Sequence, residues 1–127
     1  MNTIHVIDKF KRPIASRVRD VLNKKGVSSA QWQVINFLAA KKELRADELA
    51  EGAGVLGPSL SRIKRDLINA GILISENSTN DDRALKIRLT KSGKSLYKSL
   101  RKEVNAAMTI TKDDIRDLSR ELKMFAE

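Results

Sequence analysis

The side chains best suited to chemistry gather in residues 54–71, which read GVLGPSLSRIKRDLINAG. At helical spacing Ser61, Arg62 and Arg65 share one side of this stretch, with Lys64 on its flank. Arginine can grip a guanine edge or a phosphate with two hydrogen bonds, and serine can reach either group. The stretch therefore predicts a helix that reads DNA, and an ordinary surface helix with solvated charges is the alternative.

An apolar stripe on the other side of this stretch indicates where the helix packs. Four residues recur at three- and four-residue spacing and would together face a core: Leu60, Ile63, Leu67 and Ala70. Pro58 suits the first helical position, where its missing N–H costs nothing. Gly71 can adopt the left-handed conformation that closes a helix. The sequence thus predicts a helix with one buried side and one polar side.

Composition narrows the classes of function. The 127 residues contain no cysteine, which removes disulfides, thiol catalysis and cysteine metal ligands, and His5 is the single histidine. The sequence shows no Ser/His/Asp set and no phosphate loop, so we expect no enzyme, no cofactor and no metal. No apolar run approaches the roughly 20 residues of a membrane span, and the N-terminus lacks a signal-peptide pattern. We expect a cytoplasmic protein.

The charge balance points to a polyanionic partner. The formal net charge is +9, from 25 basic and 16 acidic residues. A basic protein of this size most often binds nucleic acid. A ribosome-associated protein is one alternative, but residues 103–127 are net acidic, which argues against a uniformly basic coat.

The segments before residue 54 predict three helices that position the DNA-reading stretch. Residues 4–25 form an amphipathic helix that Pro13 should kink or restart. Ser28 and Gln31 then make a capping box for a second helix, in which Trp32 packs in the core or lines a ligand pocket. After an extended segment, residues 43–45, the acidic helix ADELAEG should face away from DNA. A short helix, a glycine turn and a basic amphipathic helix make a helix-turn-helix.

From residue 72 onward the spacing of apolar residues changes from the helical pattern to the strand pattern. Residues 72–74 are an apolar run, and residues 85–89 alternate apolar and basic side chains, which is typical of a half-buried strand. The polar segment between them predicts a β-hairpin with a long tip. Arg83 in this tip could enter a minor groove, where a narrow and negative channel favours arginine; a solvated loop charge is the alternative.

Two amphipathic helices, predicted at residues 91–108 and after the cap Thr111, complete the chain. With the first helix they carry apolar surface that a compact winged helix cannot cover, so we expect a homodimer; a closed monomeric bundle is the alternative. The fold class is thus mainly α with a small β-hairpin wing, a winged helix-turn-helix. We expect one domain, 1–127, with a DNA-binding lobe at 27–90 and dimerisation helices at 1–26 and 91–127.

The runs VSSAQWQVINFL, ELA, PSLSRIKRDLINAGIL and DDRALKIRLTKSG resemble the MarR family of bacterial transcription regulators. The most specific part is DDRA followed by Leu89, Thr90 and Gly93, which matches the wing motif of that family. The segment LRADELAEGAGVLGPSLSRI is similar to regulators of homoprotocatechuate and related aromatic degradation operons. One departure concerns Ser75 and Glu76, because many family members carry an arginine there. The hairpin should therefore be braced differently.

The resemblance implies a homodimeric repressor of a palindromic operator that a small aromatic acid releases from DNA. Residues that would contact the major groove are Ser59, Ser61, Arg62 and Arg65. Arg83 would contact the minor groove, Asp81 would brace the wing, and Lys64, Lys86 and Arg88 would neutralise phosphates.

A carboxylate ligand needs an arginine partner and a ring needs an aromatic wall, so the candidate ligand residues are Arg12, Arg17, Ser28 and Trp32. A winged helix used only for protein–protein assembly, without specific DNA readout, is the competing interpretation.

Overall fold

The computed structural model describes residues 3–76 and 85–126, and the chain divides into two compact units. One unit is residues 27–101, and the other combines the segment up to residue 26 with the segment from residue 102 onward. Helix α5, Lys91–Met108, contributes to both. Within the described ranges no helix is long and apolar enough to cross a membrane.

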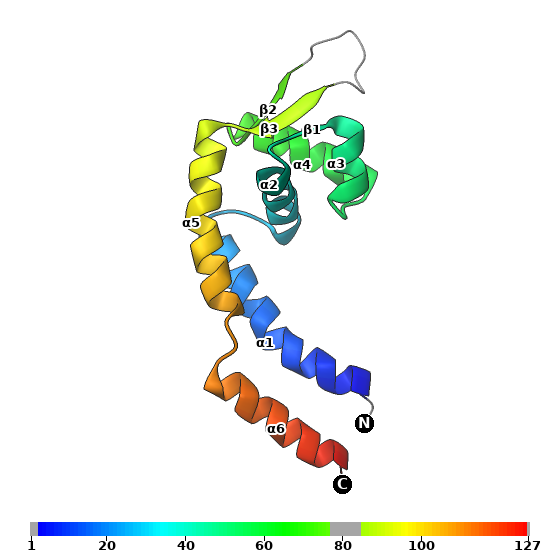
Figure 1. Cartoon of the computed structure of the whole chain (residues 1–127), viewed down its shortest axis with the longest axis vertical. Coiled ribbons are helices and arrows are strands. Elements are labelled where there is room, and N and C mark those ends of the chain that lie inside the picture. The colour runs from blue at the N-terminus through cyan, green and yellow to red at the C-terminus, as the bar shows by residue number, and fades with distance from the viewer. Residues whose placement is uncertain (1–2, 77–84, 127) are drawn as a thin grey trace. The chain divides into compact units, whose positions relative to one another are not determined.

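Three helices gather around the base of the sheet in the 27–101 unit (Figure 1): α2 (Ser29–Lys41), α3 (Ala46–Gly52) and α4 (Gly57–Asn69). The predicted capping box opens α2, since Ser28 Oγ accepts from the Gln31 N–H at 3.0 Å and Gln31 Oε1 accepts from the Ser28 N–H at 2.9 Å. The core of this unit is aliphatic, and its most deeply buried side chains are Val34, Ile35, Leu38, Leu49, Leu73, Ile87 and Leu100.

A three-stranded antiparallel sheet carries the predicted hairpin. The strands are β1 (Glu43–Arg45), β2 (Leu73–Glu76) and β3 (Lys86–Leu89), in the order β1-β3-β2. Ile87 lies opposite Leu44 on β1 and opposite Ser75 on β2. The extended segment at 43–45 was predicted, but its place as a third strand was not, because three residues are too few to show an alternating pattern.

The junction between β3 and α5 explains the Leu-Thr-x-x-Gly motif. Thr90 accepts from the Gly93 N–H at 3.0 Å, which caps α5, and its hydroxyl donates to the carbonyl of Gly71 after α4. A Cβ at Gly93 would lie 2.2 Å from the carbonyl oxygen of Ile72, so only glycine allows α5 to approach this closely. The motif thus ties α4, β2 and α5 together.

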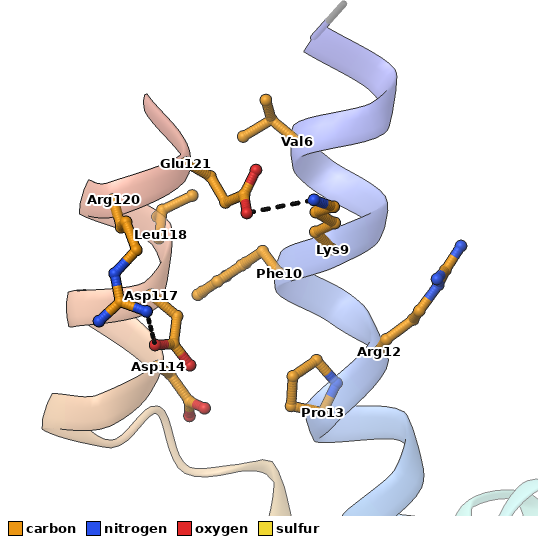
Figure 2. A pocket seen from close by; sticks show the side chains of 10 residues that line it. All are labelled: Val6, Lys9, Phe10, Arg12, Pro13, Asp114, Asp117, Leu118, Arg120 and Glu121. Atoms are coloured by element: carbon orange, nitrogen blue, oxygen red, sulfur yellow. Dashed lines mark hydrogen bonds and ion pairs between the residues drawn. The ribbon is translucent and has the colours of Figure 1, made fainter. Parts of the chain in front are cut away.

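In the other unit, α1 (Thr3–Lys24) and α6 (Lys112–Ala126) run antiparallel, side by side (Figure 1). Helix α1 continues through Pro13 as one helix, so of the two predicted outcomes, a kink or a restart, the structure excludes the restart. Figure 2 shows Phe10 of α1 and Leu118 of α6 pointing into the space between the two helices. Lys9 Nζ lies 3.2 Å from Glu121 Oε1 across that space.

Arg17 and Asp114 join α1 to the start of α6. The guanidinium donates to both carboxylate oxygens, at 3.0 and 2.9 Å, and to the carbonyl of Ala107 at 3.1 Å. Asp114 also closes a capping box with the predicted cap, Thr111, at 2.9 and 3.1 Å. The Asp114 side chain is 6% exposed. The Arg17 hydrogen bonds, followed by those of Thr111, lower the pKa of Asp114 to about 2.

This depressed pKa predicts an acid-sensitive link between α1 and α6. The Asp114 carboxylate stabilises the fold when pH is above the unfolded pKa of about 3.8, and this contribution disappears as pH falls through about 2. Asp114→Asn should lower the melting temperature at neutral pH, with the difference from wild type shrinking as pH drops from about 4 to about 2. Thermal unfolding across this range measures it. Asp113→Asn, at an 81% exposed carboxylate, is the control and should change little.

Candidate nucleic-acid interface

Helix α4 has the two-sided character that its sequence predicts. Leu60, Ile63 and Leu67 are 2%, 8% and 2% exposed, so this stripe fixes α4 to the rest of its unit. The predicted fourth member, Ala70, is exposed instead, because α4 ends at Asn69 and Ala70 is its C-cap. Three residues on the same face are enough to anchor the helix.

The ends of α4 are set by backbone constraints. Pro58 occupies the second helical position, one later than predicted, since Leu56 is the N-cap and Gly57 begins the helix. The N-cap has no side-chain hydrogen bond to the helix. Gly71 has a φ of +75°, the left-handed conformation predicted for the residue that closes α4.

The predicted reading residues lie along the exposed side of α4. Ser59, Ser61, Arg62 and Arg65 are exposed, and Lys64 is half-buried on the flank. In the described ranges Arg62, Lys64 and Arg65 have no carboxylate within ion-pair distance. An unpaired guanidinium keeps its five donors available for an external acceptor.

Helix α3 differs from α4 in charge and in pairing. Arg45, at its N-cap, lies 3.2 Å from Asp47 and 3.5 Å from Glu48, so its guanidinium is already partnered. Asp47, Glu48 and Glu51 are exposed, as predicted. Two neighbouring helices of one unit therefore present opposite charge, and of these two it is α4 that offers cations without a carboxylate partner in the described ranges.

A cleft of about 330 Å³ borders the basic side of α4. It lies between α4 and the β2–β3 strands, and Lys64 and Arg65 reach it together with Asn69 and Ser75. Asn69 and Ser75 were not predicted as site residues, because the spacing along each element does not reveal that α4 and β2 share a cleft. Their amide and hydroxyl add polar hydrogen-bonding groups beside the two cations.

Cross-strand ion pairs hold the base of the wing. Arg88 lies 2.7 Å from Glu76 on β2, and Lys86 is exposed and lies 3.4 Å from Glu43 on β1. The Arg88–Glu76 pair supplies a brace at the position where the sequence departs from its family pattern. Both predicted wing-tip residues, Asp81 and Arg83, lie outside the described residues.

The four candidate ligand residues fall in different units. Arg12 lines a cavity of about 340 Å³ between α1 and α6 (Figure 2), and Arg17 is engaged by Asp114. Ser28 caps α2 in the 27–101 unit. Trp32 in the same unit is half-buried and stacks on Tyr97, with ring centroids 5.7 Å apart and an interplanar angle of 18°. Arg17, Ser28 and Trp32 thus have structural partners of their own.

Two curated proteins are similar to much of this chain. FarR, an HTH-type transcriptional regulator from Neisseria gonorrhoeae, is 32% identical over 95 residues, which cover 75% of this chain and 65% of that protein. The homoprotocatechuate degradative operon repressor of Escherichia coli is 29% identical over 92 residues, which cover 72% and 62%. The chain thus spans less than two thirds of the length of these relatives.

Solved structures support the fold over the whole chain. The structure of NadR in complex with 4-hydroxyphenylacetate superposes with a TM-score of 0.70 at 29% identity, covering 98% of this chain and 84% of that one. Apo MarR from Escherichia coli superposes with a TM-score of 0.70 at 18% identity, covering 100% and 98%. The predicted fold class is therefore confirmed. A sequence model described as the MarR family also matches residues 25–84. This part of the chain is similar to the MarR family.

Proposed function

We propose that the protein is a transcriptional regulator that binds duplex DNA through α4. One observation carries this proposal: α4 buries Leu60, Ile63 and Leu67 while its exposed side presents Arg62 and Arg65 without a carboxylate partner in the described ranges. A helix anchored in this way can lie in a major groove with its polar side toward the base edges.

The proposed contacts divide into reading and neutralising groups. Ser59, Ser61, Arg62 and Arg65 meet base edges in the major groove. The phosphate-neutralising group comprises Lys64 and Lys86, whereas Arg88, which was predicted with them, is paired with Glu76. Arg83 enters the minor groove and Asp81 braces the wing, as the family resemblance implies.

The active form is proposed to be a homodimer. Among the residues of the α1–α6 unit whose burial the structure describes, seven large apolar side chains are exposed, which is more than scattered surface residues explain: Ile4, Ile7, Met108, Ile110, Ile115, Leu122 and Met124. Burial against a second copy would remove this surface from water. A twofold axis would present two α4 helices to half-sites of a palindromic operator, about one helical turn apart.

Regulation is proposed to be repression that a small aromatic acid relieves. The support comes from two similar proteins: one is named as the repressor of a homoprotocatechuate degradative operon, and the other was solved with 4-hydroxyphenylacetate. Such a ligand must bind the DNA-incompetent arrangement of the dimer more tightly than the competent one. Arg12, Arg17, Ser28 and Trp32 are the proposed ligand residues.

The test is a titration of the full chain with duplex DNA from the region upstream of its gene, followed by fluorescence anisotropy. Four phosphate contacts in the dimer would lower the affinity about a hundredfold between ~50 and ~200 mM salt, because each neutralised phosphate releases counterions. A scrambled duplex of equal length measures non-specific binding. If the chain bound neither duplex at any of these salt concentrations, the proposal would be contradicted and a protein–protein assembly module would be favoured.

A further inference from the structure

The 27–101 unit holds a second cavity, apart from the cleft beside α4. Its volume is about 450 Å³, and it is bounded by the end of α2, by β3 and by the first half of α5. Leu38, Ala39 and Leu89 form the apolar part of its lining, and Tyr97 adds an aromatic ring. Leu38 and Leu89 belong to the core and are 0% and 3% exposed, so packing holds the floor of the cavity in place.

The aromatic wall is also held in place. Tyr97 stacks on Trp32 with a centroid separation of 5.7 Å, although Trp32 is not itself part of the lining. A stacked ring loses little further side-chain freedom when a ligand packs against it, so the site is largely preorganised.

Cations surround this apolar floor. Lys42, Lys94, Lys98 and Arg88 line the cavity, and no carboxylate of the described residues does. Arg88 is neutralised by Glu76 at 2.7 Å. The three lysines have no carboxylate within 4.0 Å among the described residues. The cavity therefore holds an excess of positive charge next to a low-dielectric surface, where an anion is attracted more strongly than in water.

The orientation of α5 adds to this field. Lys94 and Lys98 lie on its first two turns, and the first turn contains no acidic residue. The N-terminus of an 18-residue helix carries a partial positive charge from its unpaired N–H groups. Helix dipole and lysine side chains thus act in the same direction at this end of α5.

We propose that this cavity binds a small organic anion whose apolar body is about the size of one or two aromatic rings. The volume lies within the range of small-molecule sites, which is about 300–1,000 Å³. An inorganic anion would leave Leu38, Leu89 and Tyr97 unused, and a neutral hydrocarbon would leave the lysines unused. None of the ligand residues suggested by the family resemblance lines this cavity, so it is a separate site within the lobe that carries α4.

Binding of a ligand at this site would also affect the wing. A carboxylate that approached Arg88 would compete with Glu76, the cross-strand partner that braces β3 against β2. The ligand would thereby change the support of the hairpin without touching α4. This consequence rests on the proposed DNA-binding function, whereas binding of the anion does not, so the two can fail independently.

The test is a ¹H–¹⁵N NMR titration of the full chain with 2-naphthoate, without DNA. We expect saturable shifts in the amides of Lys42, Leu89 and Tyr97. Two comparators at equal ionic strength separate the contributions: 2-naphthalenemethanol keeps the ring system without the charge, and inorganic phosphate keeps the charge without the ring system. Both should bind at least about fivefold more weakly. Equal binding of either comparator would overturn the proposal, as would shifts confined to α1 and α6.

A pair of matched double variants locates the site. Lys42→Gln with Lys98→Gln removes two cations from the lining and should weaken 2-naphthoate binding about fivefold or more. Lys41→Gln with Lys102→Gln removes the same charge from neighbouring positions on α2 and α5 that do not line the cavity, and should leave the affinity within about twofold. If both double variants lost the same affinity for 2-naphthoate, overall charge would explain the effect and the proposed site would be wrong.

Discussion

Arg62→Ala lowers the affinity for operator DNA by roughly tenfold to a hundredfold per half-site, and the two half-sites of a dimer compound the loss. The reason is that a bidentate arginine–guanine contact contributes about 1–3 kcal/mol of discrimination. Arg62 is exposed and has no ion-pair partner in the described ranges, so its truncation removes a DNA contact without disturbing the fold. Fluorescence anisotropy with specific and scrambled duplexes measures both affinity and specificity.

The matched control for this variant is Arg101→Ala. It removes the same charge from an exposed position on α5 and should reduce affinity only slightly, through weaker long-range attraction. Lys64→Gln provides a second comparison, because the loss of a phosphate contact should weaken binding to specific and scrambled duplexes alike and lower the salt slope by about one for each subunit. Full retention of specific binding by Arg62→Ala would remove α4 from the reading role.

Leu122→Glu converts the proposed dimer into a monomer. Leu122 lies on α6 and is 49% exposed, two helical turns after Ile115 on the same face of the helix, which is 55% exposed. Burying an unpaired carboxylate in an apolar interface costs several kcal/mol, so the dimer dissociation constant should rise by about a hundredfold or more. Operator affinity should fall with it, because a monomer engages one half-site only. Sedimentation equilibrium and anisotropy follow the two effects in the same samples.

Lys123→Gln is the control for the interface variant. It changes the net charge by the same amount at the next residue of α6, which is exposed and polar, and should leave the dimer intact. Circular dichroism checks that Leu122→Glu keeps its helices. A wild-type chain that sediments as a monomer at micromolar concentration would instead support the closed monomeric bundle.

Local sequence features predicted the helices that carry the interface. The residue range expected for α5 is the observed one, Lys91–Met108, because Thr90 and Gly93 mark its start and apolar residues recur along it. The capping box at Ser28 and the left-handed Gly71 were also predicted and are confirmed. Caps, glycines and helical periodicity act within a few residues of one another, so they can be recognised in the sequence.

Features that depend on contacts between different helices or strands were predicted less completely. Periodicity placed Ala70 in the buried stripe, but the end of α4 at Asn69 leaves it exposed. The sequence predicted a helix after the cap Thr111 without indicating that Asp114 in its first turn pairs with Arg17, which is 97 residues away. It marked Glu76 as a departure from a family pattern without identifying the ion pair with Arg88 that replaces it.

The sequence by itself determined the order of the elements, the two-sided character of α4 and the resemblance to the MarR family. These features follow from residue types at short spacings, where backbone hydrogen bonding and burial of one face leave few alternatives. Only the tertiary structure decided which charges are already paired and which are available to a ligand. Arg17 and Arg88 are partnered by carboxylates of other elements, whereas Arg62 and Arg65 have no carboxylate partner in the described ranges, because such pairing depends on distances between elements separated in the sequence.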